Sequence, residues 1–443
     1  ACVIWAQGEP VVVRYRCDAC GRRALDESPT DRDRALALAD RGAPVPDWPL
    51  SYADGLPYVE SQGAASVRDL LWPRARLGLS WLLAAIAAED AALRPALRQV
   101  LTAMVHLVSR LCPVPKPGPT NHATPFSSFW AQHSFNRPAS AAMEQPIWAK
   151  FHASYFGHQG WRKAQLDVTA VGGPWTRSAN PAGWLAGQGA LLALSGPARA
   201  SLADVAAAAG GPCIDLMFAD PPYGGTIQYG ELSSLWNAFL LDGPAAAGLR
   251  DQMAREEVVC NRAQGKDLRD FAKDLQAHFE AARPLVRPGA PVIVTFHSPK
   301  GALRHAAIGA IVRAGYHLVE IQHNAGARMS AKACQQPFGS VEGDFWLVFT
   351  PDVGPRQVTA DIDWTCRTVA LAQAVLAAAH GPLPYTELIN RLEPRLAANG
   401  FFATATAPVG VDGVLKQAST AGALKLVEGQ VAGVTGWLWT VVR

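Results

Sequence analysis

The stretch Cys213-Ile214-Asp215-Leu216-Met217-Phe218-Ala219-Asp220-Pro221-Pro222-Tyr223 decides the fold class of this 443-residue chain. Residues 213–219 form an apolar run of strand length, which the two prolines end because proline fixes φ and has no N–H to donate. Further apolar runs and helical patterns alternate along the chain, at 190–194, 267–285, 291–296, 303–314, 316–322 and 344–350. Strands that alternate with helices predict an α/β fold with a mostly parallel sheet covered on both faces.

The tetrapeptide Asp220 to Tyr223 directly follows the strand, so it is expected to line the crevice where ligands of open α/β sheets bind. Asp220 can accept one N–H of a planar amino group, and the carbonyl of Pro221 can accept the other. Both acceptors pull the nitrogen toward a tetrahedral geometry with an available lone pair. Pro221 and Pro222 hold the turn rigid, and Tyr223 offers a flat face for a base taken out of its stack. The alternative is a Pro-Pro loop that only ends a strand, and the strand context with all four residues argues against it.

These residues resemble the amino-methyltransferase family, whose signature is Asp/Asn/Ser-Pro-Pro-Tyr/Phe/Trp. More narrowly, the chain resembles bacterial adenine-specific DNA methylases that carry an inserted zinc ribbon. The resemblance covers most of residues 1–350 and rests on the order of several blocks: 3–6 with Cys17 and Cys20, 74–86 with 109–111, 133–135 with Trp148, 220–223 with 229–233, and 295–297.

The resemblance implies a class I (Rossmann-like) methyltransferase sheet, S-adenosylmethionine as methyl donor and a flipped base as acceptor. Asp220 and Tyr223 match the family's catalytic positions, and Asp220 also adjoins the cofactor. Transfer would be direct, with the protein supplying alignment and electrostatics. DNA is the expected partner ahead of RNA. Aspartate as first motif residue favours adenine N6 over cytosine N4 as a family tendency.

The chain departs from the family in one respect, since it has no glycine-rich cofactor loop after a first strand. Gly187-Gln188-Gly189 precedes the predicted strand 190–194 instead of following one. Residues 2–6 look like a strand already under way, and the first residue is not methionine. We therefore expect a truncated N-terminus, with the loop upstream and the strand 190–194 next before the catalytic strand.

Cys17 and Cys20 follow a strand with the spacing of half a zinc ribbon, in which two such pairs supply four thiolates. The other pair is not visible, so zinc is expected in a complete ribbon and not in this stretch alone. The eight cysteines are otherwise scattered, which favours a reducing compartment, the cytoplasm. No uninterrupted apolar run reaches membrane-spanning length.

Composition changes divide the chain into four segments. Residues 1–24 hold two short strands of a partial zinc ribbon, and 25–189 form a loop (25–62), a helical insertion (66–111) and an irregular stretch (120–189). Residues 190–355 form the methyltransferase catalytic half. Residues 365–443 read as three helices and a hairpin, the order of a winged-helix domain, although a helical cap with a terminal hairpin fits equally well.

Several weaker signals leave alternatives open. A net charge of +3 neither identifies nor excludes a nucleic-acid partner. The basic residues of 250–266 suit a phosphate-contacting loop or, more commonly, a solvated surface, and His297 suits the crevice or a structural role. Trp130, His133 and Trp148 are expected in the core or scaffold. Two other functions compete: a tRNA guanine-N2 methyltransferase, and a DNA-binding subunit without catalysis.

Overall fold

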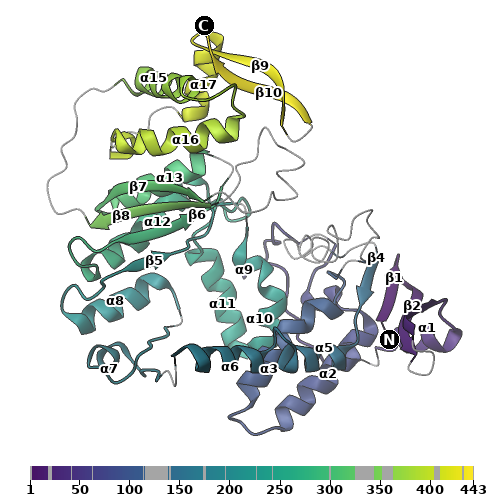
Figure 1. Ribbon diagram of the computed structural model, residues 1–443. Helices are drawn as coiled ribbons and strands as arrows, with labels where there is room; N and C mark the ends of the chain where they lie inside the picture. Colours follow the sequence, from purple (N-terminus) through teal and green to yellow (C-terminus); the bar gives the residue numbers. More distant parts are fainter. Residues whose placement is uncertain are drawn as a thin grey trace. The chain divides into compact units, whose positions relative to one another are not determined.

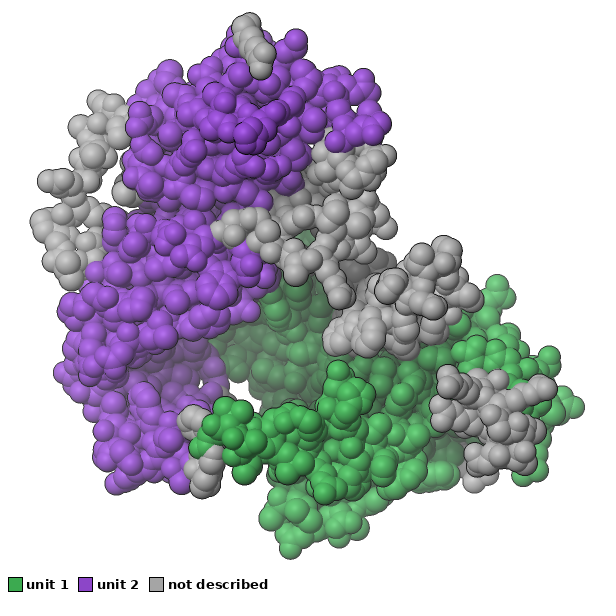
Figure 2. All heavy atoms as spheres, viewed as in Figure 1, with its two compact units in different colours: residues 1–175, 227–257, 261–265 green, residues 176–226, 258–260, 266–443 purple. Residues whose placement is uncertain are grey.

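The computed structural model describes residues 2–17, 22–40, 42–61, 63–112, 114, 138, 141–172, 176–194, 196–225, 227–241, 243–298, 301–324, 344–351, 363–403, 410–431 and 434–442. These residues form helices and several sheets, which confirms the mixed α/β class. The chain divides into two compact units (Figure 2). Unit 1 contains residues 1–175, 227–257 and 261–265, and unit 2 contains residues 176–226, 258–260 and 266–443. Among the described residues, no helix is long and apolar enough to cross a membrane.

Unit 1 contains a four-stranded antiparallel sheet, in the order β3-β2-β1-β4. Its strands are β1 (Cys2–Ala6), β2 (Glu9–Cys17), β3 (Arg22–Glu27) and β4 (Ala141–Glu144). Gln7 and Gly8, both with positive φ, connect β1 to β2, so the two strands predicted around Gly8 are confirmed. The buried Trp5 ring stacks on Trp72 at 4.3 Å and donates its N–H to Glu144 at 2.9 Å. This buried contact joins the sheet to the helices of unit 1.

The helices of unit 1 correct two expectations. They are α1 (Asp31–Ala37), α2 (Pro73–Ala88), α3 (Arg94–Val105), α5 (Ile147–Phe156), α6 (Trp161–Gly172), α9 (Tyr229–Leu232), α10 (Ser234–Leu240) and α11 (Gly243–Glu256), with 3-10 turns at Val67–Leu70 and His106–Val108. The predicted loop 25–62 contains α1, because Thr30 and Asp33 form a capping box that begins a helix in a polar stretch. The predicted irregular stretch 120–189 contains β4 and three helices within its described residues.

Unit 2 is built on a sheet with the strand order β5-β6-β8-β7 (Figure 1). Its strands are β5 (Met217–Ala219), β6 (Val292–Phe296), β7 (Tyr316–Asn324) and β8 (Asp344–Pro351). β5 runs parallel to β6, and β8 runs antiparallel to both of its neighbours, β6 and β7. β5, β6 and β7 therefore point the same way, but two of the three strand pairings are antiparallel, so the prediction of a mostly parallel sheet is wrong for the described strands. Only β5 and β6 pair in parallel, because the last strand inserts between β6 and β7.

Two predicted strands are shorter or absent. β5 pairs only over Met217–Ala219, and Ile214 makes an isolated parallel bridge to Val286 before it. The predicted strand 190–194 is reduced to one parallel bridge between Leu191 and Arg177. The apolar run has the pattern of a strand but pairs with no neighbouring strand in the described residues. Leu191 and Leu194 are 48% and 45% exposed. Within the described residues this segment does not join the sheet next to β5, which corrects the prediction.

One face of the unit 2 sheet is buried and the other is partly exposed. On β6 the residues Val292, Val294 and Phe296 are buried, and their partners on β8 are buried phenylalanine and leucine side chains. These strands share one core with α12 (Leu268–Ala282) and α13 (Gly301–Arg313). On the other face Phe218 is 60% exposed. Coverage of both faces, as predicted, is therefore incomplete among the described residues.

The rest of unit 2 flanks this sheet in the sequence. Before it lie α7 (Pro181–Leu185) and α8 (Ala198–Ala209), and 3-10 turns occur at Arg283–Leu285 and Phe401–Ala403. After it come α15 (Trp364–Ala377), α16 (Tyr385–Ala398), α17 (Val411–Thr420), β9 (Leu424–Val431) and β10 (Val434–Val441). The predicted three helices and hairpin are present in that order, and Leu383 bridges to Trp439 of β10. Their buried side chains belong to the same core as the sheet.

Candidate active site at one edge of the unit 2 sheet

Three strand ends meet at one edge of the unit 2 sheet. Because β5 and β6 are parallel, Asp220 after β5 and His297 after β6 lie at the same edge. β8 runs the other way, so its first residue, Asp344, also lies there, beside the pair Phe296–Phe345. The predicted residue Asp220 therefore shares this edge with the end of β6 and the start of β8.

Asp220 is exposed and held by two hydroxyl groups. Its Oδ1 accepts a hydrogen bond of 2.6 Å from the Tyr223 hydroxyl and one of 2.8 Å from the Thr295 hydroxyl. No residue in the described part of the chain donates to its Oδ2. The two hydroxyls thus fix the carboxylate and leave Oδ2 as an acceptor for an outside N–H donor.

Tyr223 is half-buried and fixed at both ends of its ring. Its hydroxyl donates to Asp220, and its ring packs edge-to-face on Phe296 with centroids 5.4 Å apart. The His297 ring lies 6.3 Å from the same ring. From the sequence, Tyr223 was predicted to offer a face for base stacking. The structure shows in addition that its hydroxyl binds the Asp220 carboxylate. No contact in the structure tests the stacking role.

The turn after the motif depends on Gly224. This buried residue has φ +62°, in the left-handed region, and a Cβ at this position would lie 2.3 Å from Cδ2 of Leu303 in α13. Pro221 and Pro222 are half-buried on the other side of Tyr223. Because proline limits one end of the loop and close packing limits the other, the tetrapeptide is held in one conformation.

His297 contacts a carboxylate at the same edge. Its Nδ1 lies 3.2 Å from Oδ1 of Asp344, and both side chains are substantially exposed. An imidazole oriented by a carboxylate can move a proton or contact a phosphate. Both interpretations of His297, in a crevice or in a structural role, stay predictions. Sequence analysis missed Asp344, whose location depends on how β8 pairs.

Two further groups of residues were predicted from the sequence, the basic residues of 250–266 and the aromatic residues expected in the core or scaffold. Arg250 lies on α11 and donates to the backbone carbonyls of Ser51 and Tyr52, and Lys266 lies 3.7 Å from Asp274. Trp148 is 66% exposed on α5, so of its two predicted places, core or scaffold, the core is wrong. Trp130 and the block 133–135 lie outside the described residues.

The predicted metal ligands are described only in part. Cys17 is the last residue of β2, its side chain is not described, and Cys20 lies outside the described residues. β3 begins at Arg22 and pairs antiparallel with β2. Over the described ranges, no group of three or more His, Cys, Asp or Glu residues could hold a metal ion.

Gly187-Gln188-Gly189, the segment that comes nearest in the sequence to a glycine-rich cofactor loop, does not follow a strand in the structure. Gly187-Gln188-Gly189 connects α7 to the bridge at Leu191. A Cβ on Gly189 would lie 2.5 Å from the backbone nitrogen of Ser178, so a side chain at this position would clash with the backbone that crosses it.

Comparison of the chain with protein-family models, with curated proteins and with solved structures gave no match in any of the three.

Proposed function

We propose that this chain carries the base-binding part of an S-adenosylmethionine-dependent methyltransferase that acts on an exocyclic amino group in DNA, adenine N6 in first place. The observation that carries the proposal is the carboxylate of Asp220, fixed by Tyr223 and Thr295 with one oxygen open. A fixed acceptor at the carboxyl end of a strand is what a planar amino group needs to be aligned for attack.

In the proposed reaction, Oδ2 of Asp220 accepts one N–H of the base amino group and the carbonyl of Pro221 accepts the other. These hydrogen bonds draw the lone pair of the nitrogen out of conjugation with the ring. When bound, S-adenosylmethionine would supply an electrophilic methyl group: its bond to sulfur breaks as the bond to the amino nitrogen forms, S-adenosylhomocysteine leaves, and one amino proton passes to solvent. The protein's part is alignment, because Thr295 and Tyr223 hold the carboxylate before the base arrives.

The fold supports the same proposal. A sheet whose strands mostly share one direction, with one reversed strand, is common among doubly wound α/β proteins, where ligands bind at the carboxyl edge. The helices and hairpin after residue 363 have the order of a winged-helix DNA-binding domain, which would bring the duplex to the site. A zinc ribbon at Cys17 and Cys20, and action in the cytoplasm, belong to the same proposal.

Leu216 and Phe218 leave large apolar surfaces exposed beside β5, with 57% and 60% of their areas accessible. β5 is also the terminal strand of the described sheet, and further strands can pair with the backbone at such an edge.

The test compares the wild-type gene product with Asp220→Ala and Asp215→Ala in cells that lack base methylation. Asp215 is a matched control, since it precedes β5 on the same run and pairs with Arg287 outside the site. DNA and tRNA are digested to nucleosides and measured by mass spectrometry. N6-methyladenine in DNA, lost only in Asp220→Ala, supports the proposal. Methylguanine confined to tRNA, or no methylated base in either polymer, contradicts it.

A further inference from the structure

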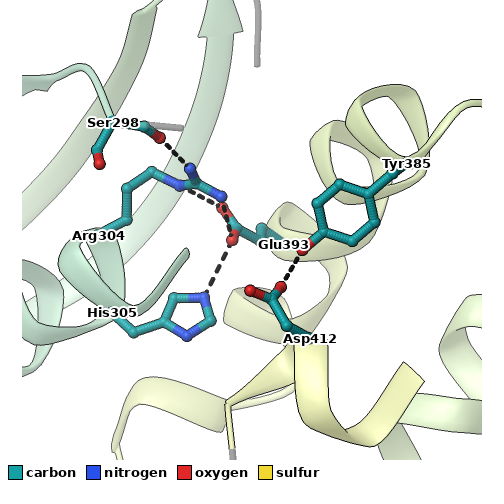
Figure 3. Close-up of polar contacts among 6 residues, drawn as sticks. All are labelled: Ser298, Arg304, His305, Tyr385, Glu393 and Asp412. Atoms are coloured by element: carbon teal, nitrogen blue, oxygen red, sulfur yellow. Dashed lines mark hydrogen bonds and ion pairs between the residues drawn. The ribbon is translucent and has the colours of Figure 1, made fainter. Parts of the chain in front are cut away.

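A buried ion pair contacts the residues that follow His297 and Asp344 in the chain. Arg304 on α13 and Glu393 on α16 are each 1% exposed. Nε of Arg304 lies 2.9 Å from Oε2 of Glu393, and Nη2 lies 2.6 Å from Oε1, so two of the three guanidinium nitrogens bind the carboxylate side-on (Figure 3). The pair connects the helix that follows β6 to a helix 89 residues further along the chain.

Arg304 also touches the immediate neighbours of both members of the His297–Asp344 pair. Its Nη1 donates to the backbone carbonyl of the fully buried Ser298, the residue after His297 (Figure 3). Its guanidinium carbon lies 4.5 Å from the ring centroid of Phe345, the residue after Asp344. One side chain therefore holds the end of β6 and the start of β8 together.

The first turn of α13 packs against carboxylates of the C-terminal helices. A Cβ on Gly301 would lie 3.6 Å from Oδ1 of Asp412 and 3.9 Å from Oε1 of Glu393. Asp412 accepts a hydrogen bond from Tyr385 of α16, so both carboxylates are fixed (Figure 3). Negative charge near a helix N-terminus is favourable. The C-terminal helices thus fix α13 at the end that follows the site.

The electrostatics show that the pair is charged. Burial raises the pKa of Glu393, but Arg304 and His305 outweigh it and lower this pKa to about 2. Nε2 of His305 lies 3.0 Å from Oε1 of Glu393. Burying an ion pair costs desolvation energy, and a well-packed apolar pair is often as stable. Fold stability alone is therefore a weak explanation for this arrangement.

We propose that Arg304 and Glu393 are positioning residues, through which α16 sets the position of the His297–Asp344 pair at the candidate site. The effect on turnover rests on the proposed function. The effect on the geometry of His297 does not, because it follows from the contacts of Arg304 alone.

The experiment compares Glu393→Gln and Arg304→Lys with Glu144→Gln. Glu144 is a matched control, because it is also a fully buried carboxylate, bound by Trp5 and Arg74 in unit 1. The imidazole resonances of His297 are recorded in protein labelled with 15N-histidine and assigned with His297→Gln. Turnover and KM for DNA methylation are measured on the same samples.

We expect Glu393→Gln and Arg304→Lys to move the His297 resonances and to lower turnover about 10- to 100-fold, with KM changed less than about twofold. A shift of the end of β6 also moves Thr295, which holds Asp220, and small misplacements of reacting groups cost such factors. Glu144→Gln should leave the His297 resonances unchanged. Unchanged His297 resonances in folded Glu393→Gln would overturn the proposal, and Arg304→Lys decides if Glu393→Gln does not fold. Wild-type protein without methylation activity would defeat the proposed function, while the resonances would still decide this inference.

Discussion

Replacing Gly224 by alanine adds one methyl group at the turn that follows the candidate catalytic residues. The residue has φ +62°, where an alanine costs about 1–2 kcal/mol. The added Cβ would lie 2.3 Å from Cδ2 of Leu303, and forcing such a contact apart in a packed region costs about 1–3 kcal/mol more. We therefore expect Gly224→Ala to reduce the free energy of unfolding by about 2–5 kcal/mol.

Gly210→Ala separates the two contributions. Gly210 ends α8 with φ +65°, and nothing lies within 4 Å of the Cβ that the substitution would add. This variant should lose only the conformational part, about 1–2 kcal/mol. Urea unfolding of both variants measures the difference, and nucleoside mass spectrometry measures methylation. If Gly224→Ala is no less stable than Gly210→Ala, or keeps full methylation activity, the account of a turn held by close packing is refuted.

Three further predictions concern other parts of the molecule. Thr295→Val removes one of the two hydroxyls on Asp220 and should lower methylation turnover about tenfold in a kinetic assay, the equivalent of one hydrogen bond; unchanged turnover would exclude this role. The pKa of Glu393 is lowered from 4.5 to about 2, so its charge stabilises the fold above pH 4.5 and this contribution is lost as pH falls toward 2. The stability difference between wild type and Glu393→Gln in urea unfolding should therefore shrink over that range, and a difference that grows would contradict the reasoning. Zinc bound to the full-length gene product, measured by elemental mass spectrometry, should fall when Cys17 and Cys20 are replaced by serine, and an unchanged zinc content would remove these cysteines as ligands.

Local signals in the sequence predicted most of unit 2. The runs at 291–296, 316–322 and 344–350 became β6, β7 and β8 within two residues, because strand alternation and flanking turns are local properties. The motif from Asp220 was placed correctly after β5 for the same reason, since two prolines must follow the strand directly.

The rest of the site depends on contacts between distant residues. Asp344 reaches His297 only because β8 inserts in reverse between β6 and β7, and the sequence pattern does not specify that register. The Arg304–Glu393 pair joins two helices far apart in sequence. The run 190–194 shows the opposite error, since a good apolar pattern formed only a single bridge without a neighbouring strand.

The most direct measurement of the central claim uses purified full-length gene product, S-adenosylmethionine with a trideuterated methyl group, and duplex DNA. After digestion, mass spectrometry locates the deuterated methyl group on each nucleoside. The account predicts label on the exocyclic amino group of adenine with the wild type and its loss with Asp220→Ala. Label that persists in Asp220→Ala, or wild-type protein that transfers no label to DNA, would contradict it.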